Sequence, residues 1–343
     1  MNTFEVDPLQ DPRWRGFVEG HRSASVFHRA EWLQALKNAY GYKPMAVSLC
    51  PPDSPLTNAV VFCEIRSSLT GKRIVSLPFS DHCEPLVENA DEAGPLLDNI
   101  KSRVKQKNWK YVEIRPLSLS PWQEKISTIT STYCLHRLDL RCSEEQLIRG
   151  FHKDYRKVRR AERESLRYQE GASENLLEQF YRLFVLTRRK HHLPPQPLRW
   201  FRSLISSFGR DLKIRIALKN DTPIASILTL SHRKTMTYKY GCSDAKFQNL
   251  GGTVFLLRKT IIEARAEGFE EFDMGRSDIE NQGLIRFKEH WGATRSSLNY
   301  LRYPIEFVAP ERKWALWIVR HLISATPDSS LIKLGSLLYR HIG

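Results

Sequence analysis

The chain has 343 residues, enough for two domains that each bury their own core. Lys and Arg number 53 against 38 Asp and Glu, so the net charge is +15, which favours an anionic partner: nucleic acid, a nucleotide-linked substrate or an anionic membrane surface. No uncharged apolar run approaches the roughly 18 residues of a membrane span, and no basic region followed by an apolar run opens the chain. We therefore expect a soluble, cytoplasmic protein.

The six cysteines are scattered, with no Cys-x-x-Cys pair and no histidine cluster at metal spacing. Ordinary thiols in a reducing compartment are the expected reading, and no metal is predicted. His191 and His192 precede a Pro-rich turn, and neighbours on a chain seldom share one metal, so we interpret them as loop residues.

The first half predicts a hairpin, a third strand, a polar tip, a helix and a further strand. An apolar face that ends at Gly41 predicts an earlier helix over residues 27–40. Short apolar segments, separated first by the Pro-rich turn 51–55, predict the strands. The ranges are strands 45–50, 59–65 and 73–77, tip 78–82, helix 93–107 and strand 111–115.

The second half repeats that order, and the whole chain is organised around its part from residue 235 to residue 276. Here the predicted elements are strands 212–218, 224–230 and 235–241, helix 253–268 and strand 270–274. Strand, glycine loop, helix and strand form a parallel βαβ crossover. Ser80 and Asp81 hold the place that Ser243 and Asp244 hold in the second copy.

Gly251 and Gly252 stand just before the helix of the second copy, where backbone N–H groups point outward. A helix N-terminus of this kind favours an anion such as a phosphate. The first copy has no such glycines, so only the second is expected to bind an anion there.

Between the copies, Ser143 and Gln146 predict a capping box. Residues 149–167 hold eight basic side chains against three acids. They form either a solvated face with local ion pairs such as Arg160–Glu164, or a docking surface for a phosphate-bearing substrate or tRNA. The basic side chains are Arg149, Lys153, Arg156, Lys157, Arg159, Arg160, Arg163 and Arg167.

An amphipathic helix is predicted over residues 174–190. The tail, residues 305–343, combines tryptophans and aliphatic residues with basic ones. It is interpreted as a helix pair packed on the second domain, with weak association to anionic lipid as the alternative.

The segment Gln248-Asn-Leu-Gly-Gly-Thr253 is similar to the Gln/Arg-x-x-Gly-x-Gly/Ala motif of GNAT acyltransferases, but ends in Thr. More specifically, the chain resembles the Fem-like (FemAB-type) group of GNAT proteins, which carry two GNAT-like domains in tandem. The resemblance implies an α/β protein with mixed twisted sheets and helices on both faces. Its parts would be residues 1–142 without the glycine loop, the acyltransferase domain 143–304 and the helical tail 305–343. The matching stretches are 26–44, 77–86, 151–170, 180–197 and 238–291.

The resemblance implies transfer of an acyl or aminoacyl group to an amine, commonly on a cell-envelope precursor of peptidoglycan or exopolysaccharide. The donor would be acyl-CoA, with aminoacyl-tRNA as the alternative and tRNA as a partner. The expected donor-binding residues are Gln248, Gly251, Gly252, Thr253 and Tyr240. Tyr238 and Tyr240 alternate along one strand, and at most one of them is expected to contact ligand.

The pair Phe287-Lys288 matches a Fem-type feature, which implies that Lys288 stabilises the carbonyl oxyanion and that Phe287 contacts substrate. Asp273 and Arg276 end a strand of the crossover unit, where ligands tend to bind. Asp273 either holds or deprotonates the amine, or pairs with Arg276 to shape the turn.

Asp81, His82 and Arg115 end two strands of the first copy. They are expected to bind the acceptor, with His82 as an alternative base, or else to form a satisfied turn. The chain shows no Gly-x-Ser-x-Gly and no cysteine in a catalytic motif, so direct transfer without a covalent enzyme intermediate is predicted. The rivals are a non-catalytic RNA-binding protein and a membrane-peripheral scaffold on the same fold.

Overall fold

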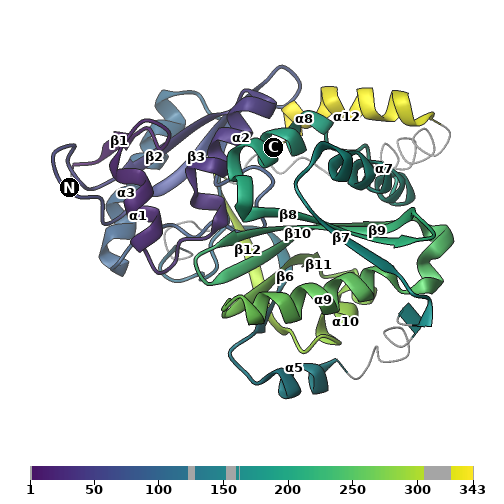
Figure 1. The fold of residues 1–343 in the computed structure, drawn as a ribbon. Helices are drawn as coiled ribbons and strands as arrows, with labels where there is room; N and C mark the ends of the chain where they lie inside the picture. Colours follow the sequence, from purple (N-terminus) through teal and green to yellow (C-terminus); the bar gives the residue numbers. More distant parts are fainter. Residues whose placement is uncertain (1, 123–127, 152–159, 162, 305–325, 343) are drawn as a thin grey trace. The chain divides into compact units, whose positions relative to one another are not determined.

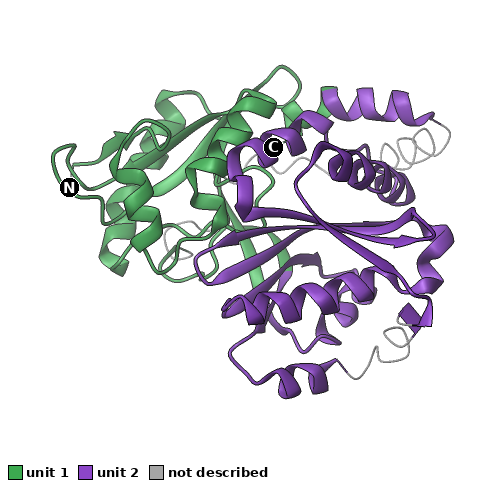
Figure 2. Ribbon diagram, in the orientation of Figure 1, with its two compact units in different colours: residues 1–133, 297–311, 337–343 green, residues 134–296, 312–336 purple. Residues whose placement is uncertain are grey.

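The computed structural model describes residues 2–122, 128–151, 160–161, 163–304 and 326–342 (Figure 1). It divides into two compact units (Figure 2). Unit 1 comprises residues 1–133, 297–311 and 337–343, and unit 2 comprises residues 134–296 and 312–336. The chain crosses between units inside strands β6 (Ile129–Asp139) and β12 (Thr294–Tyr303), whereas the sequence suggested a boundary after residue 142.

In unit 1 the strands follow the order β1-β2-β3-β4-β5-β12. Neighbours pair antiparallel except β4 and β5, which are parallel and joined by helix α3. Asn89 and Glu92 form a capping box at the start of α3, whose apolar face packs on the sheet through Leu96, Leu97 and Ile100. The bounds are β1 Phe4–Val6, β2 Lys43–Ser48, β3 Val60–Ser67, β4 Gly71–Val75, α3 Ala90–Gln106 and β5 Val112–Ile114.

In unit 2 the strands follow the order β6-β11-β10-β9-β8-β7. Helix α7 lies on one face of this sheet and α9 on the other (Figure 1). Helix α7 buries an aliphatic and aromatic stripe, and α9 buries mainly aliphatic residues such as Val254, Leu257 and Ile261. The bounds are β7 Arg167–Gly171, α7 Glu174–Lys190, β8 Leu212–Lys219, β9 Thr222–His232, β10 Thr235–Ser243, α9 Gly252–Ala266 and β11 Glu271–Asp278.

The predicted repeat of element order is present. β2-β3-β4-α3-β5 in unit 1 and β8-β9-β10-α9-β11 in unit 2 follow the same sequence of antiparallel, antiparallel and parallel pairings. The mixed sheets with helices therefore agree with the predicted α/β class.

The remaining described helices flank these cores. The predicted helix over 27–40 begins with a 3-10 turn, and the extended backbone of Arg29 separates that turn from α2. The predicted Ser143–Gln146 capping box opens α5. The bounds are α1 Arg13–Gly20, the 3-10 turn Val26–His28, α2 Ala30–Tyr40, α5 Glu144–Gly150, α8 Leu198–Phe208, α10 Gln282–Glu289 and α12 Asp328–Ile342.

Most of the predicted tail (residues 305–325 and 343) and about half of the basic run (residues 152–159 and 162) lie outside the described residues. Within unit 2, Arg189 pairs with Asp328 at the start of α12, and Leu331 is fully buried. A Cβ on Gly335 would lie 1.9 Å from the carbonyl oxygen of Pro195, so α12 packs closely there. In the part of the chain that the structure describes, no helix is long and apolar enough to cross a bilayer.

Candidate functional site

The predicted crossover of unit 2 opens where β10 and β11 part. The two strands pair in parallel over residues 235–237 and 271–273 only, although they run on to Ser243 and Asp278. The register of β10 with β9 shifts between Tyr238 and Tyr240, a β-bulge at Lys239. A bulge re-aims backbone groups next to a site. The parted strand ends therefore present backbone N–H and C=O groups that a ligand can pair with.

The glycines before α9 serve two different purposes. Gly251 has φ +75°, a left-handed conformation that glycine adopts without strain, and caps the helix. Gly252 has an ordinary φ, but a Cβ there would lie 3.0 Å from the Cβ of Ala225 and 3.1 Å from Cδ1 of Ile224. Its missing side chain thus lets α9 pack closely on β9, a requirement that is independent of any ligand.

The N-terminus of α9 nevertheless has the properties of an anion site. The first backbone N–H groups of a helix have no intrahelical acceptor, and the helix dipole favours negative charge there. Thr253 lies half-buried in the first turn, and no side chain caps the helix. Lys190 Nζ lies 3.3 Å from Gln248 Oε1, so a cation stands beside the predicted motif.

Lys288 is buried, with 3% of its surface exposed. Its Nζ donates to the carbonyl oxygens of Gly275 (2.8 Å) and Arg276 (3.0 Å). Successive carbonyls of a regular strand point in opposite directions, so one ammonium cannot bind both. Gly275 has φ +70°, which turns the two carbonyls to the same side. The structure thus brings Lys288 of α10 to the parted end of β11, together with Arg276.

Asp273 is buried at the last paired position of β11, opposite Thr237. Its Oδ1 accepts the backbone N–H of Gly275 at 2.8 Å. The carboxylate therefore stabilises the same turn of β11 that the Lys288 ammonium binds.

His136 on β6 is a site residue that the sequence analysis did not identify. Its side chain is fully buried, and neither ring nitrogen has a hydrogen-bond partner among the described residues. Burial, and next the positive charge of Lys288, lower its pKa from 6.5 to about 4. A neutral imidazole therefore lies in the electrostatic field of Lys288. The β-branched and aromatic residues of 129–133 (Ile-Thr-Ser-Thr-Tyr) were a usable strand signal, but that range was not predicted as a strand.

Two other predicted residues sit in apolar surroundings. Tyr240 packs in an aromatic cluster, with its ring centroid 5.2 Å from that of Phe201 and 5.7 Å from that of Phe184. Its hydroxyl accepts the Trp200 indole N–H at 2.9 Å. Phe287 packs edge-on against Trp291, with the centroids 6.3 Å apart. Both contacts are those of core residues, and ligand contact by either stays a prediction.

The predicted tip of unit 1 is held by Arg115. Its guanidinium donates to the carbonyl oxygens of Leu77 (2.6 Å) and Ser80 (3.0 Å) and pairs with Glu113 at 2.8 Å. Asp81 accepts the Tyr300 hydroxyl at its backbone oxygen. His82 is buried, and its ring packs edge-on against Phe27 at 5.3 Å. Unit 1 therefore brings these three predicted residues together at the ends of β4 and β5.

Three of the six thiols are poor candidates for nucleophilic catalysis. Burial raises the pKa of Cys63, Cys83 and Cys242, which keeps these thiols protonated at neutral pH. In the described parts of the chain, no group of three or more His, Cys, Asp or Glu side chains is arranged to hold a metal ion.

Comparisons with known proteins bear on the domain and the fold. Residues 149–289 match the family model of the acetyltransferase (GNAT) domain. The FemX crystal structure superposes with a TM-score of 0.66 at 13% identity, covering 88% of this chain and 97% of that chain. The predicted tandem GNAT-like fold is confirmed, and so, at the level of the fold, is the predicted resemblance to the Fem-like group.

Two further solved structures share the fold. A tandem GNAT protein from the clavulanic acid biosynthesis pathway has a TM-score of 0.55 at 9% identity, over 88% of this chain and 98% of that chain. The C-terminal domain of a putative lysylphosphatidylglycerol synthetase from Agrobacterium fabrum has a TM-score of 0.54 at 14% identity, over 77% and 86%. No curated protein sequence matches the chain.

Proposed function

Since residues 149–289 are a GNAT acetyltransferase domain, we propose that the protein transfers an acyl or aminoacyl group from a CoA thioester, or from aminoacyl-tRNA, to an amine. The observation that carries this proposal is the meeting, in unit 2, of parted strands β10 and β11 with the buried cation of Lys288. A substrate carbonyl placed between strands can pair with backbone groups there. A cation beside it then stabilises the charge that develops during transfer.

The donor phosphates would bind the N-terminus of α9. Gly252 and Thr253 supply first-turn N–H groups there, since the N–H of Gly251, which caps the helix, donates to the carbonyl oxygen of Gln248. Gln248 therefore lies next to them, and Lys190 adds positive charge. Gly252 contributes by letting α9 approach β9. Net charge +15 supports an anionic donor of either kind, CoA or tRNA.

In the reaction, the neutral amine attacks the donor carbonyl carbon and a C–N bond forms. The tetrahedral oxyanion lies in the field of Lys288 and of the β10 bulge. The C–S bond, or the C–O bond of an ester, then breaks, and the amine proton passes to the leaving sulfur or oxygen, giving an amide and free CoA or tRNA. Asp273 would relay that proton. Asp81, Arg115, Arg276 and Phe287 stay predicted acceptor-binding residues, and His82 stays the predicted alternative to Asp273 as base.

The acceptor is proposed to be an amine on a cell-envelope or polysaccharide precursor. FemX and the lysylphosphatidylglycerol synthetase domain share the fold, which supports this class of acceptor. We place the protein in the cytoplasm. Peripheral association with the membrane would use α12, which exposes Leu334, Leu337 and Ile342.

Incubation of the purified protein with acetyl-CoA and a mixture of amine-bearing envelope precursors tests the proposal, with free thiol release and product mass as readouts. Lys288→Met should lower turnover by about 100-fold, because one well-placed electrostatic donor contributes about 3 kcal/mol to the transition state. Lys259→Met, a half-exposed lysine of α9, is the matched control and should keep full activity. Melting curves must accompany both, because Lys288 is buried. A folded Lys288→Met variant with full activity would remove Lys288 from the mechanism.

The non-catalytic RNA-binding alternative rests on the basic run, of which residues 152–159 lie outside the described part of the chain. Its described member Arg160 lies 3.9 Å from Glu164, the local ion pair expected of a solvated face. RNA binding that weakens steeply with salt, without thiol release from any donor, would favour it.

A further inference from the structure

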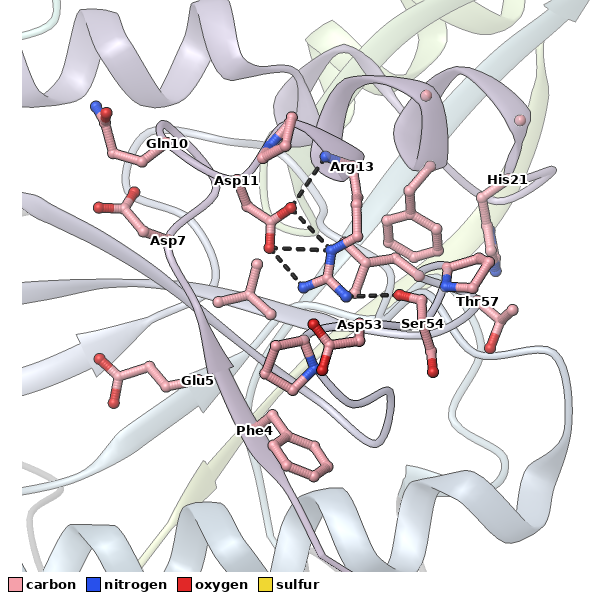
Figure 3. Close-up of a pocket in the computed structure, with 18 of the residues that line it drawn as sticks. Phe4, Glu5, Asp7, Gln10, Asp11, Arg13, His21, Asp53, Ser54 and Thr57 are labelled. Carbon is pink, nitrogen blue, oxygen red and sulfur yellow. Dashed lines mark hydrogen bonds and ion pairs between the residues drawn. The ribbon is translucent and has the colours of Figure 1, made fainter.

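A second candidate site lies wholly in unit 1, between β1, α1 and the loop from residue 51 to residue 57 (Figure 3). It is a cavity of about 1090 Å³, within the size range that holds small ligands. Apolar side chains, among them Phe4, Phe17 and Leu56, line its walls. None of the residues predicted for acyl transfer lines it.

The polar lining of this cavity is acidic on a chain whose net charge is +15. Five carboxylates line it, from Glu5, Asp7, Asp11, Asp53 and Glu88, against one guanidinium, that of Arg13. Burial lowers the pKa of His21, the other basic residue of the lining, so its ring is neutral at pH 7.

The Arg13 guanidinium is already satisfied. It pairs with Asp11, with Nη2 and Oδ2 2.6 Å apart, and donates through Nη1 to the carbonyl oxygens of Ser54 (2.6 Å) and Pro51 (2.8 Å), as Figure 3 shows in part. These bonds tie the loop to α1 and hold the cavity wall in place. Arg13 therefore neutralises Asp11, and its charge also acts on Asp53 without an ion pair between the two.

Glu5 pairs with Arg103, which is not a lining residue. Asp7, Asp53 and Glu88 form no ion pair with any described residue, and in Figure 3 Asp53 lies between Arg13 and the Phe4 ring. Three carboxylates around apolar walls complement an organic cation with an aliphatic body. Such a ligand places methylenes against the walls and ammonium groups against the carboxylates.

We propose that this cavity binds an aliphatic amine cation of the polyamine type. The inference rests on unit 1 alone and does not depend on the proposed acyl transfer. A negative transfer assay would not contradict amine binding in this cavity, and a negative binding result would not contradict acyl transfer.

Calorimetric titration of the full chain with spermidine tests the proposal, with triethylene glycol as an uncharged linear probe. We expect spermidine to bind one site with a Kd at or below about 1 mM, and triethylene glycol not to bind. Asp53→Asn and Glu88→Gln should each weaken spermidine binding about fivefold, because a partly shielded ion pair contributes about 1 kcal/mol. The double variant should weaken it about 25-fold.

Asp98→Asn is the matched control: Asp98 is an exposed carboxylate of α3 in the same unit and does not line the cavity. It should bind spermidine as the unaltered chain does. Equal weakening in Asp98→Asn and Asp53→Asn would show that spermidine only screens surface charge, and would overturn the proposal. Absence of spermidine binding, unchanged affinity in the double variant, or equally tight binding of triethylene glycol would also overturn it.

Discussion

His136 gives the sharpest stability prediction, because its imidazole is fully buried and both ring nitrogens lack hydrogen-bond partners among the described residues. The perturbation is His136→Leu, which removes both nitrogens and keeps a side chain of similar volume. At pH 7.5 the variant should be as stable as the unaltered protein or up to about 2 kcal/mol more stable. The reason is that the desolvation of a buried polar group without a hydrogen-bond partner destabilises the folded state.

The pH dependence follows from the lowered pKa of His136, about 4 in the folded state against 6.5 unfolded. Above pH 6.5 both states hold the neutral ring, and His136 gives no pH dependence. As pH falls from 6.5 to 4, the unfolded state binds the proton and the folded state does not, so stability is lost in that window. At pH 4.5 the loss amounts to about 2.5 kcal/mol.

Urea unfolding at pH 7.5 and 4.5 measures this prediction. The difference in unfolding free energy between His136→Leu and the unaltered protein should grow by about 2.5 kcal/mol at the lower pH. His136→Gln is the matched control, because it keeps a polar side chain that does not titrate. It should show the same growth without the gain at pH 7.5. A difference that stays constant with pH in both variants would refute the reasoning.

Three further predictions concern packing and charge. Gly252→Ala should destabilise the fold by about 1–2 kcal/mol, because the added Cβ would lie 3.0 Å from the Cβ of Ala225. In a double-mutant cycle of urea melts, adding Ala225→Gly to that variant should recover about 1 kcal/mol. Additive effects of the two substitutions would contradict the contact. Gly275→Ala should lower the free energy of unfolding more than Gly268→Ala in the same melts. Both glycines have positive φ (+70° and +84°), but only the carbonyl of Gly275 also binds the buried Lys288 ammonium. Equal losses would argue that the turn at Gly275 does not support the Lys288 contact. Glu113→Gln should lower the free energy of unfolding by about 3 kcal/mol at pH 7, because it leaves two guanidiniums facing one neutral amide. The difference between the variant and the unaltered protein should vanish as pH falls through the lowered pKa of the Glu113 carboxyl. A difference that persists at low pH would exclude the charge as its cause.

Local patterns in the sequence predicted the repeated order of elements well. Alternation over residues 212–218 and the stop at Gly268 mark β8 and the end of α9, because each depends on residues close in the chain. Strand pairing between distant parts of the chain could not be predicted from such local patterns. β12 pairs with β5 although almost 200 residues separate them, and no local pattern encodes such a partner.

The candidate site likewise combines features that the sequence predicts with features that only the structure shows. Resemblance led to Lys288, but its burial and its two carbonyl acceptors depend on the left-handed turn at Gly275, which the sequence alone does not reveal. Gly252 was assigned to donor binding from its motif, whereas the structure adds a packing role that no motif states. His136 was not identified because strand β6 was not predicted. Its importance becomes apparent only when its burial and the nearby charge of Lys288 are known.

The central claim, an acyl donor bound at the N-terminus of α9, is tested most directly by calorimetric titration with CoA and acetyl-CoA, and with bulk tRNA, at low and moderate salt. Thr253→Glu is the variant of choice, because a carboxylate in the first turn suits the helix dipole but repels a bound phosphate; Thr253→Gln is its control. The account predicts saturable binding of CoA or of tRNA that survives moderate salt, is lost in Thr253→Glu and is kept in Thr253→Gln. Binding of neither donor, or equal binding by both variants, would contradict it.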